Sequence, residues 1–408
     1  MPAKVAIIHH GYIPHYRVPF YEMLARRGEA AYTVFHGDPP SWIGVQAAEG
    51  PFDFRERRVA NREFRVGPGT AVYQPLVREV LSGGYDAVVL SAEVKFVSNV
   101  ALALLAPLYR IAVLYWGFGY HPQRGFRDSD APHRGLFGGV NFIKNALTRM
   151  ADGYLAYTAT GVEKLAEIGY PRDRAFVMRN TIDVSEQRRL CEQVQSADPG
   201  TIRSEWGLQP NSTVFTFIGR LVQFKRVDLL IEAVRLANQN RAGKPAIEAV
   251  VIGSGPLEGE LRAMAADVPQ LHFTGALPPD ARVAGILKVS AAVAITGALG
   301  LLINHAFAHG KPVIARDHEA HGAEIEYLAH DENGLIVPGD IGAFAETLCR
   351  YADAPEWQAR LCGGALQARE AMSLEAMVDR FEAAIAATVA RRRAGWLSAP
   401  PLAYSGRD

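Results

Sequence analysis

Hydrophobic and polar positions along the chain alternate between two patterns. Short runs of aliphatic and β-branched residues predict buried strands, and apolar positions at helical spacing predict helices between them. In the first half the predicted strands are residues 5–8, 31–35, 87–90, 111–115, 154–157 and 175–178, and the predicted helices are 19–27, 72–81, 97–108, 140–150 and 162–168. Residues 37–68 show no clear period, so we expect an irregular insertion there. The alternation predicts parallel strands with helices on both faces of a sheet.

The same alternation returns after a polar stretch at residues 185–210. The predicted strands are residues 213–218, 246–252, 272–274, 291–295 and 312–315, and the predicted helices are 228–237, 257–266, 280–288, 301–309, 323–329, 342–352, 356–371 and 374–393. We therefore expect an α/β protein with two doubly wound, Rossmann-like domains, at residues 1–182 and 183–373. The helix at 374–393 is expected to pack back on the first domain, and 394–408 to form a loose tail. Ligands of such sheets bind at the carboxyl ends of the strands and between facing domains.

Composition and charge exclude several classes of function. The chain has 49% hydrophobic and 21% charged residues, as ordinary globular proteins do. Its 43 basic and 43 acidic residues give no net charge, which argues against a nucleic-acid partner. Three scattered cysteines favour a reducing compartment over a disulfide framework or a zinc site. The apolar run at residues 5–8 is too short for a signal peptide, and no stretch predicts a membrane-spanning helix. We expect a cytoplasmic protein.

Charge is distributed unevenly between the two halves. Residues 1–182 hold 21 Lys and Arg against 16 Asp and Glu, a net charge of +5, and the remainder holds 22 against 27, a net charge of −5. The basic half contains the cluster Arg55, Arg57, Arg58, Arg62 and Arg65. One interpretation is a solvated loop. The other is a surface for an anionic acceptor or for anionic lipid headgroups, which predicts peripheral contact with the inner face of a membrane.

The segment at residues 217–228 combines basic residues with a strand-to-helix turn. A predicted strand ends at Gly219, and a predicted helix begins near Lys225. Arg220 and Lys225 stand five positions apart between them, where a guanidinium and an ammonium group can converge on one anion. The sequence therefore predicts a phosphate site that uses side chains, unlike a glycine-rich phosphate loop.

This segment resembles the family-4-type retaining glycosyltransferases of the GT-B fold. The matching residues are Gly219-Arg220-Leu221, Lys225 and Leu230-Ile231-Glu232-Ala233, and further similarity lies at residues 16–21, 180–183, 250–257 and 273–277. The resemblance implies two Rossmann-like domains facing across a cleft, and Arg220 and Lys225 holding the diphosphate of a UDP- or GDP-sugar. It implies that Leu277 lies in a loop that contacts the donor base. No metal and no cofactor other than the nucleotide-sugar co-substrate is expected.

The chain departs from the family at the donor-sugar motif, where two glutamates usually stand eight positions apart. Here these positions are Gly297 and His305, with Gly300-Leu301 between them. His305 is either a ligand of a ribose hydroxyl or an ordinary helix histidine. The segment from Gly297 to Leu301 precedes a predicted helix, whose free N–H groups favour a diphosphate without any carboxylate.

Five further residues are candidates for ligand contacts. Glu324 is expected to orient the donor or to cap a helix. Gly11, after the first strand, would let backbone approach a ligand closely. Arg17, Gly117 and His121 are candidate sugar or acceptor contacts, and a surface-loop histidine is the alternative for His121.

These features predict a retaining, metal-independent glycosyltransferase that moves a sugar from a UDP- or GDP-sugar to an acceptor hydroxyl. The acceptor class stays open between carbohydrate, lipid-linked and small-molecule acceptors, in polysaccharide, glycolipid or natural-product biosynthesis. The missing glutamates motivate an alternative, a catalytically silent GT-B protein that acts as a binding or scaffold partner. A dinucleotide-dependent oxidoreductase is disfavoured, because no Gly-x-Gly-x-x-Gly follows the first strand.

Overall fold

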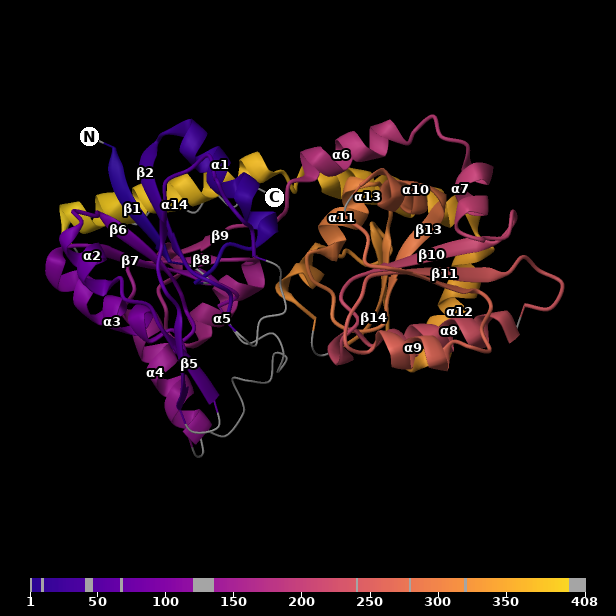
Figure 1. Ribbon diagram of the computed structural model, residues 1–408, viewed down its shortest axis with the longest axis horizontal. Coiled ribbons are helices and arrows are strands. Elements are labelled where there is room, and N and C mark those ends of the chain that lie inside the picture. Colours follow the sequence, from indigo (N-terminus) through magenta and orange to yellow (C-terminus); the bar gives the residue numbers. More distant parts are fainter. Residues whose placement is uncertain are drawn as a thin grey trace. The chain divides into compact units, whose positions relative to one another are not determined.

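The computed structural model describes residues 2–8, 11–40, 47–66, 69–119, 136–239, 241–278, 280–318 and 321–395, with backbone alone at 136–140. The described chain divides into two compact units. The first unit runs to Asn180 and resumes at Leu374, and the second unit runs from Thr181 to Ser373. Figure 1 shows the elements of both units, coloured along the sequence. None of the described helices has the length and apolar character needed to cross a membrane.

The described part of the first unit contains a parallel sheet in the order β3-β2-β1-β6-β7-β8-β9. Its strands are β1 (Ala3–Ile8), β2 (Ala30–His36), β3 (Glu56–Arg58), β6 (Ala87–Ser91), β7 (Ala112–Gly117), β8 (Gly153–Ala156) and β9 (Ala175–Val177). In the centre, Val5 pairs with Tyr32 on one side and with Ala87 on the other. The central strands are nearly continuous apolar runs, because helices cover both faces of the sheet.

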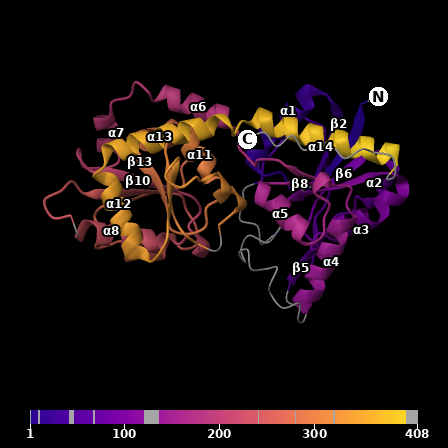
Figure 2. The same ribbon diagram turned by 180° about the vertical axis from the view of Figure 1, so that it is seen from behind.

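Helices of the first unit cover this sheet. They are α1 (Val18–Arg27), α2 (Val77–Ser82), α3 (Val97–Leu105), α4 (Leu136–Met150), α5 (Ala159–Glu167) and α14 (Leu374–Ala394), with 3-10 turns η1 (His15–Arg17), η2 (Ala106–Tyr109) and η5 (Arg172–Arg174). Helix α14 contacts α1, β7, β8 and β9, and Phe381 of α14 packs edge-on against Phe20 of α1. Helices α2, α3 and α4 lie side by side in Figures 1 and 2.

Two predictions for the first unit were wrong. The expected irregular insertion contains β3, which extends the sheet, and β4 (Arg62–Val66), which pairs antiparallel with β5 (Gly69–Tyr73). The helix expected from residue 72 begins at Val77 instead, because Val72 belongs to β5. Every residue of β4 is exposed, so its sequence carries no alternation between buried and solvated positions.

The described part of the second unit contains a parallel sheet in the order β12-β11-β10-β13-β14-β15. Its strands are β10 (Thr213–Ile218), β11 (Ile247–Ile252), β12 (Leu271–Gly275), β13 (Ser290–Ile295), β14 (Val313–Arg316) and β15 (Gly334–Val337). Its helices are α6 (Val184–Gln193), α7 (Pro199–Glu205), α8 (Val227–Gln239), α9 (Glu258–Met264), α10 (Ala281–Val289), α11 (Leu302–Ala308), α12 (Ile341–Ala352) and α13 (Pro355–Glu370), with 3-10 turns η6 (Gln223–Lys225) and η7 (Ala323–Tyr327).

The polar stretch expected at residues 185–210 is largely helical, because it contains most of α6 and all of α7. Strand β15 was also not predicted. Asp183 caps α6 by accepting hydrogen bonds from the backbone N–H groups of Ser185 and Glu186. Asp198 caps α7 through the N–H of Thr201. These helices contain few apolar residues, so their sequence shows no clear hydrophobic period, and the capping carboxylates were the signal that could have predicted them.

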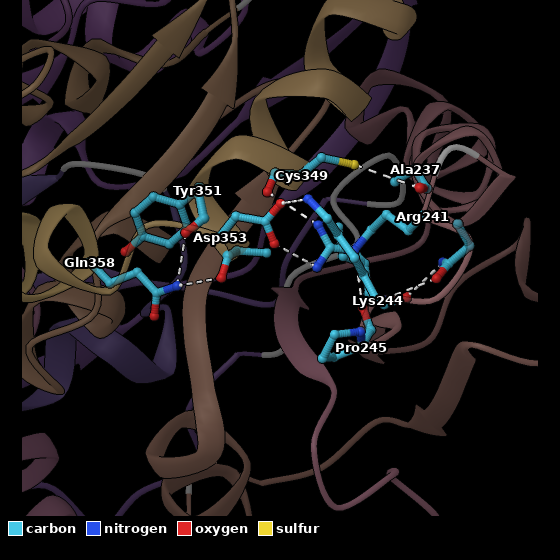
Figure 3. Close-up of polar contacts among 11 residues, drawn as sticks. Ala237, Arg241, Lys244, Pro245, Cys349, Tyr351, Asp353 and Gln358 are labelled. Carbon is cyan, nitrogen blue, oxygen red and sulfur yellow. Dashed lines mark hydrogen bonds and ion pairs between the residues drawn. The ribbon is translucent and has the colours of Figure 1, made fainter.

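A polar cluster fastens the amino end of β11 to α12 (Figure 3). Arg241 is buried; its guanidinium donates to the carbonyl oxygen of Pro245 (3.0 Å) and to Asp353 Oδ1 (2.8 Å). Lys244 Nζ donates to Asp353 Oδ2 at 2.7 Å. Because β11 starts at Ile247, this cluster lies at the sheet edge opposite the carboxyl ends of the strands. It contributes to stability at a distance from the candidate site.

Candidate functional site

Three neighbouring strands of the second unit end in glycines whose backbones pack against one another. Gly219 N–H donates to the carbonyl oxygen of Ile252 at 2.9 Å, and Gly253 N–H donates to the carbonyl oxygen of Gly275 at 2.8 Å. Gly253 has φ +144°, and a Cβ there would overlap the carbonyl oxygen of Gly219. The carboxyl edge of β10–β12 is therefore formed by bare main chain, which a flat ligand can approach closely.

Arg220 and Lys225 follow β10 in different environments. Arg220 is exposed, and its side chain makes no hydrogen bond or ion pair within the described part of the chain. Lys225 is half-buried in η6, and its Nζ donates to the carbonyl oxygen of Ala298 at 2.7 Å. Burial lowers the pKa of Lys225, and the negative charge of Glu324 opposes this lowering. Arg220 is thus open to an anion, while Lys225 also holds a neighbouring loop.

That neighbouring loop, residues 297–301, connects β13 to α11. Ala298 N–H donates to the carbonyl oxygen of Phe224 at 2.9 Å. A Cβ on Gly297 would lie 2.5 Å from the carbonyl carbon of Lys225, whereas a Cβ on Gly300 would meet nothing within 4 Å. The loop is therefore pressed against η6 at Gly297 and open at Gly300, and Leu301 leads from it into α11.

His321 fixes the same loop from the other side, and the sequence analysis did not identify it. Leu299 N–H donates to Nδ1 of His321 at 3.0 Å, and Nε2–H of His321 donates to the carbonyl oxygen of Arg316 at 3.0 Å. Gly322 N–H donates to the carbonyl oxygen of Leu299 at 2.7 Å. Burial lowers the pKa of His321 to about 4, so its imidazole is neutral at physiological pH. The only feature of the sequence that could have pointed to His321 is its place directly before the Gly322–Glu324 segment.

Glu324 and His305 occupy different positions around this loop. Glu324 is buried in η7, and its negative charge acts on Lys225. His305 is half-buried in α11; burial, with a smaller electrostatic contribution from His305, lowers the pKa of His309 to about 4. The structure therefore brings Gly219, Lys225, Gly297 and Glu324 together.

Other candidates lie apart from this group. Leu277 is half-buried in the loop after β12, which is separated from β10 by β11. In the first unit, Gly11 follows β1 with φ +73°, and Gly117 ends β7, with β6 between those two strands. His121 lies outside the described residues.

Arg17, a candidate sugar or acceptor contact in the sequence, is buried and packs against neighbouring side chains. It is 1% exposed, and its guanidinium donates to Oδ1 of Asn180 and lies 5.2 Å from the ring centroid of Trp116. Its Nη1 contacts Met377 Sδ of α14 at 3.7 Å. These contacts join η1 to α14, and an acceptor cannot reach the guanidinium while they persist.

The buried histidines predict a loss of stability in acid. His321 is 9% exposed, and the pKa values of both His309 and His321 are lowered to about 4 from an ordinary value near 6.5. As pH falls from 6.5 to 4 the unfolded chain takes up protons that the folded chain excludes, so the free energy of unfolding decreases over that window. We expect a loss of roughly 1–3 kcal/mol per histidine. Denaturant unfolding at several pH values measures this.

The variant His321→Gln serves as the matched comparison, because glutamine keeps one donor and one acceptor without titrating in this range. Its stability should depend less steeply on pH than that of the wild type, and adding His309→Gln should flatten the dependence further. An unchanged slope in both variants would contradict this assignment.

Comparison with known proteins identifies this part of the chain. The family model for glycosyl transferases group 1 matches residues 212–354. Residues 212–354 are a glycosyl transferases group 1 domain. The group 1 domain contains every candidate residue of the second unit, from Gly219 to Glu324.

Curated relatives match over part of their length. A D-inositol 3-phosphate glycosyltransferase of Frankia alni is 28% identical over 206 residues, which cover 48% of this chain and 48% of the relative. The D-rhamnosyltransferase WbpZ of Pseudomonas aeruginosa is 29% identical over 149 residues, covering 34% of this chain and 36% of the relative. The matched region thus spans about half, or less, of these relatives.

Solved structures resemble nearly the whole chain. Anabaena Alr3699/HepE in complex with UDP has a TM-score of 0.67 at 16% identity, covering 94% of this chain and 100% of that one. WaaG, a glycosyltransferase involved in lipopolysaccharide biosynthesis, has a TM-score of 0.63 at 13% identity. The match covers 93% of this chain and 98% of that chain. The fold of the group 1 domain and of the rest of the chain is GT-B, as the sequence predicted.

Proposed function

We propose that this protein is a glycosyltransferase that moves a sugar from a nucleotide-sugar to an acceptor hydroxyl. The observation that carries the proposal is the pair Arg220 and Lys225 at the carboxyl end of β10, inside the group 1 domain. Both are cationic, and Lys225 is tied to the 297–301 loop next to it. Such a pair suits the diphosphate of a donor. The UDP complex of the Anabaena relative supports UDP as the nucleotide, with GDP as the alternative.

The chemistry requires stabilisation of a leaving group. The bond between the anomeric carbon and the diphosphate oxygen breaks, and its electron pair stays on the diphosphate. The positive charges of Arg220 and of Lys225, which is held by the carbonyl oxygen of Ala298, stabilise that developing charge. The acceptor oxygen bonds to the anomeric carbon on the same face, and its proton passes to the diphosphate. The anomeric configuration is retained, and no protein nucleophile is needed.

The donor's remaining contacts follow from the loop geometry. Backbone at Gly219, Gly297, Gly300 and Leu301 lines the phosphate side, and the loop of Leu277 is proposed to contact the base. Glu324 orients Lys225 and, through it, the 297–301 loop. The acceptor is proposed to be a carbohydrate, a lipid-linked saccharide or a small molecule, and not a nucleic acid. Backbone at Gly11 and Gly117 is proposed to contribute to the sugar or acceptor side.

A nucleotide panel tests the proposal directly. Thermal unfolding is measured with UDP, GDP and ADP, because a ligand that binds only the folded state raises the melting temperature. UDP or GDP should raise it most, and the corresponding sugars should be consumed when acceptors are supplied. Nucleotide binding without turnover on any donor would favour the silent scaffold. Absence of binding to all three nucleotides would contradict the donor site.

We propose that transfer needs no metal ion. The positive charge at the diphosphate is supplied by Arg220 and Lys225, and among the described residues no group of three His, Cys, Asp or Glu is arranged to hold a metal. We expect transfer rates to be unchanged by EDTA. Complete loss of activity that manganese or magnesium restores would contradict the proposal.

His305 is proposed to replace the ribose-binding glutamate of related enzymes. A neutral imidazole can exchange one hydrogen bond with a sugar hydroxyl. His305→Ala should therefore weaken nucleotide binding by about 1 kcal/mol, the usual value of one neutral hydrogen bond. His305→Glu should be tolerated better than His305→Ala. Calorimetric titration with the nucleotide measures both, and equal affinities of wild type and His305→Ala would assign His305 to packing.

We also propose a cytoplasmic location with peripheral contact at the inner face of a membrane. Cys191, Cys349 and Cys362 are free thiols, which suits a reducing compartment. The excess of basic residues in the first 182 residues suits anionic headgroups.

A further inference from the structure

Exposed apolar side chains gather on helices α3 and α4 of the first unit and on the 3-10 turn η2 that follows α3. Eight of the fourteen large apolar side chains exposed in the described residues lie on α3, η2 and α4. They are Val97, Leu104, Leu105, Leu108, Tyr109, Phe142, Ile143 and Met150, which we call the α3–α4 face. Leu108 is 76% exposed and Phe142 is 66% exposed. The second unit exposes three in its described residues, Phe224, Met264 and Leu366, on three different elements.

Charges on these elements are all of one sign. Residues 97–110 and 136–150, which cover α3, η2 and α4, contain Arg110, Lys144 and Arg149 and no aspartate or glutamate. Arg110 and Arg149 are exposed, each directly beside an exposed apolar residue of the α3–α4 face. An outward surface of this composition combines apolar insertion with attraction for anions.

The neighbouring hairpin is also apolar and mainly basic, with one acid, Glu63. Strand β5 contacts α3, and its partner β4 carries exposed Arg62 and Arg65 beside exposed Phe64 and Val66. By contrast, two members of the arginine cluster singled out in the sequence are already paired. Arg57 binds Glu79 at 3.0 Å, and Arg58 binds Asp38 at 2.5 Å.

We propose that the α3–α4 face docks the protein on a lipid bilayer that contains anionic headgroups. This deepens the membrane contact within the proposed function by assigning it to a surface. A bilayer supplies hydrocarbon for Leu108 and Phe142 and negative charge for the flanking arginines. A second copy of the chain docked through the same face would supply apolar contact and no negative charge, because these helices hold no aspartate or glutamate to pair with Arg110 and Arg149.

Vesicle co-sedimentation without nucleotide tests the docking. The wild type should bind vesicles of phosphatidylcholine with phosphatidylglycerol and should bind pure phosphatidylcholine much more weakly. The double variant Leu108→Asp/Phe142→Asp should lower the bound fraction by about tenfold, because it places charge where the bilayer interior would be. Leu366→Asp, which alters an exposed apolar residue of the second unit, is the matched control and should bind as the wild type does.

A second variant keeps the test decisive if the aspartates disturb folding. Arg110→Glu/Arg149→Glu changes exposed charges alone and should abolish the preference for phosphatidylglycerol. Unchanged binding by this variant, or a dimer in sedimentation velocity that it dissociates, overturns the proposal. Donor turnover is measured separately on a water-soluble acceptor. Vesicle binding that fails while transfer proceeds contradicts the docking alone, and transfer that fails while vesicle binding persists contradicts the glycosyltransferase assignment alone.

Discussion

Arg220→Ala and Lys225→Ala should each lower kcat/KM for transfer by at least about tenfold, which corresponds to about 1.4 kcal/mol of transition-state stabilisation. Arg220 is exposed at the end of β10 without a partner among the described residues, so its removal disturbs no contact of the folded protein. The melting temperature of the Arg220→Ala variant should therefore match that of the wild type. Lys225→Ala also releases Ala298, so a modest loss of stability is expected there. Steady-state kinetics with UDP- and GDP-sugars measure the effect.

Two control variants distinguish the effect of removing a charge at the candidate site from the effect of removing one elsewhere. Arg350→Ala removes an exposed arginine from the last turn of α12 and should leave kcat/KM unchanged. Asp353→Asn weakens the cluster of Arg241 and Lys244 at the opposite sheet edge, so it should lower the melting temperature and spare transfer. If Arg220→Ala and Lys225→Ala retain wild-type affinity and turnover, the diphosphate assignment fails.

Gly253→Ala should destabilise the protein by about 4 kcal/mol or more, near the upper limit for single substitutions. A Cβ there overlaps the backbone of Gly219, and φ +144° is unfavourable for any other residue. The collision is between main chain and Cβ, so no side-chain rotation relieves it. Urea unfolding of the variant measures the loss.

Gly259→Ala provides the matched glycine control. Gly259 lies in α9, where a Cβ would meet nothing within 4 Å. Alanine favours a helix over glycine by roughly 0.5–1 kcal/mol, so this variant should be slightly more stable than the wild type. Equal, small effects at both glycines would show that the backbones of β10 and β11 separate easily.

Hydrophobic period predicted most of the fold, because buried strands and helices leave a strong pattern. Strand β10 spans the six residues predicted for it, and α8 differs from its prediction by one residue at one end and two at the other. The pattern failed where burial is slight. Strand β4 is wholly exposed, and α6 contains few apolar residues and is capped by Asp183.

Spatial relations at the candidate site were predicted less completely. The order of residues in the chain placed Arg220 and Lys225 after β10. It could not reveal that Lys225 reaches Ala298, seventy-three positions later, or that His321 accepts a hydrogen bond from Leu299. The burial of Arg17 beside Trp116 and α14 likewise depends on long-range packing. Such contacts between distant segments have no local pattern.

The packing at Gly297 limits how the proposed donor site could be redesigned. A glutamate at this position would restore the carboxylate pattern of related enzymes, and the variant needs one codon change. Its Cβ would nevertheless lie 2.5 Å from the carbonyl carbon of Lys225 in η6. Any side chain at Gly297 would therefore push η6 outward and displace the ammonium group of Lys225, for which we propose contact with the leaving diphosphate. Laboratory evolution toward new donor sugars should begin at Gly300, where a side chain has room, and should leave Gly297 unchanged.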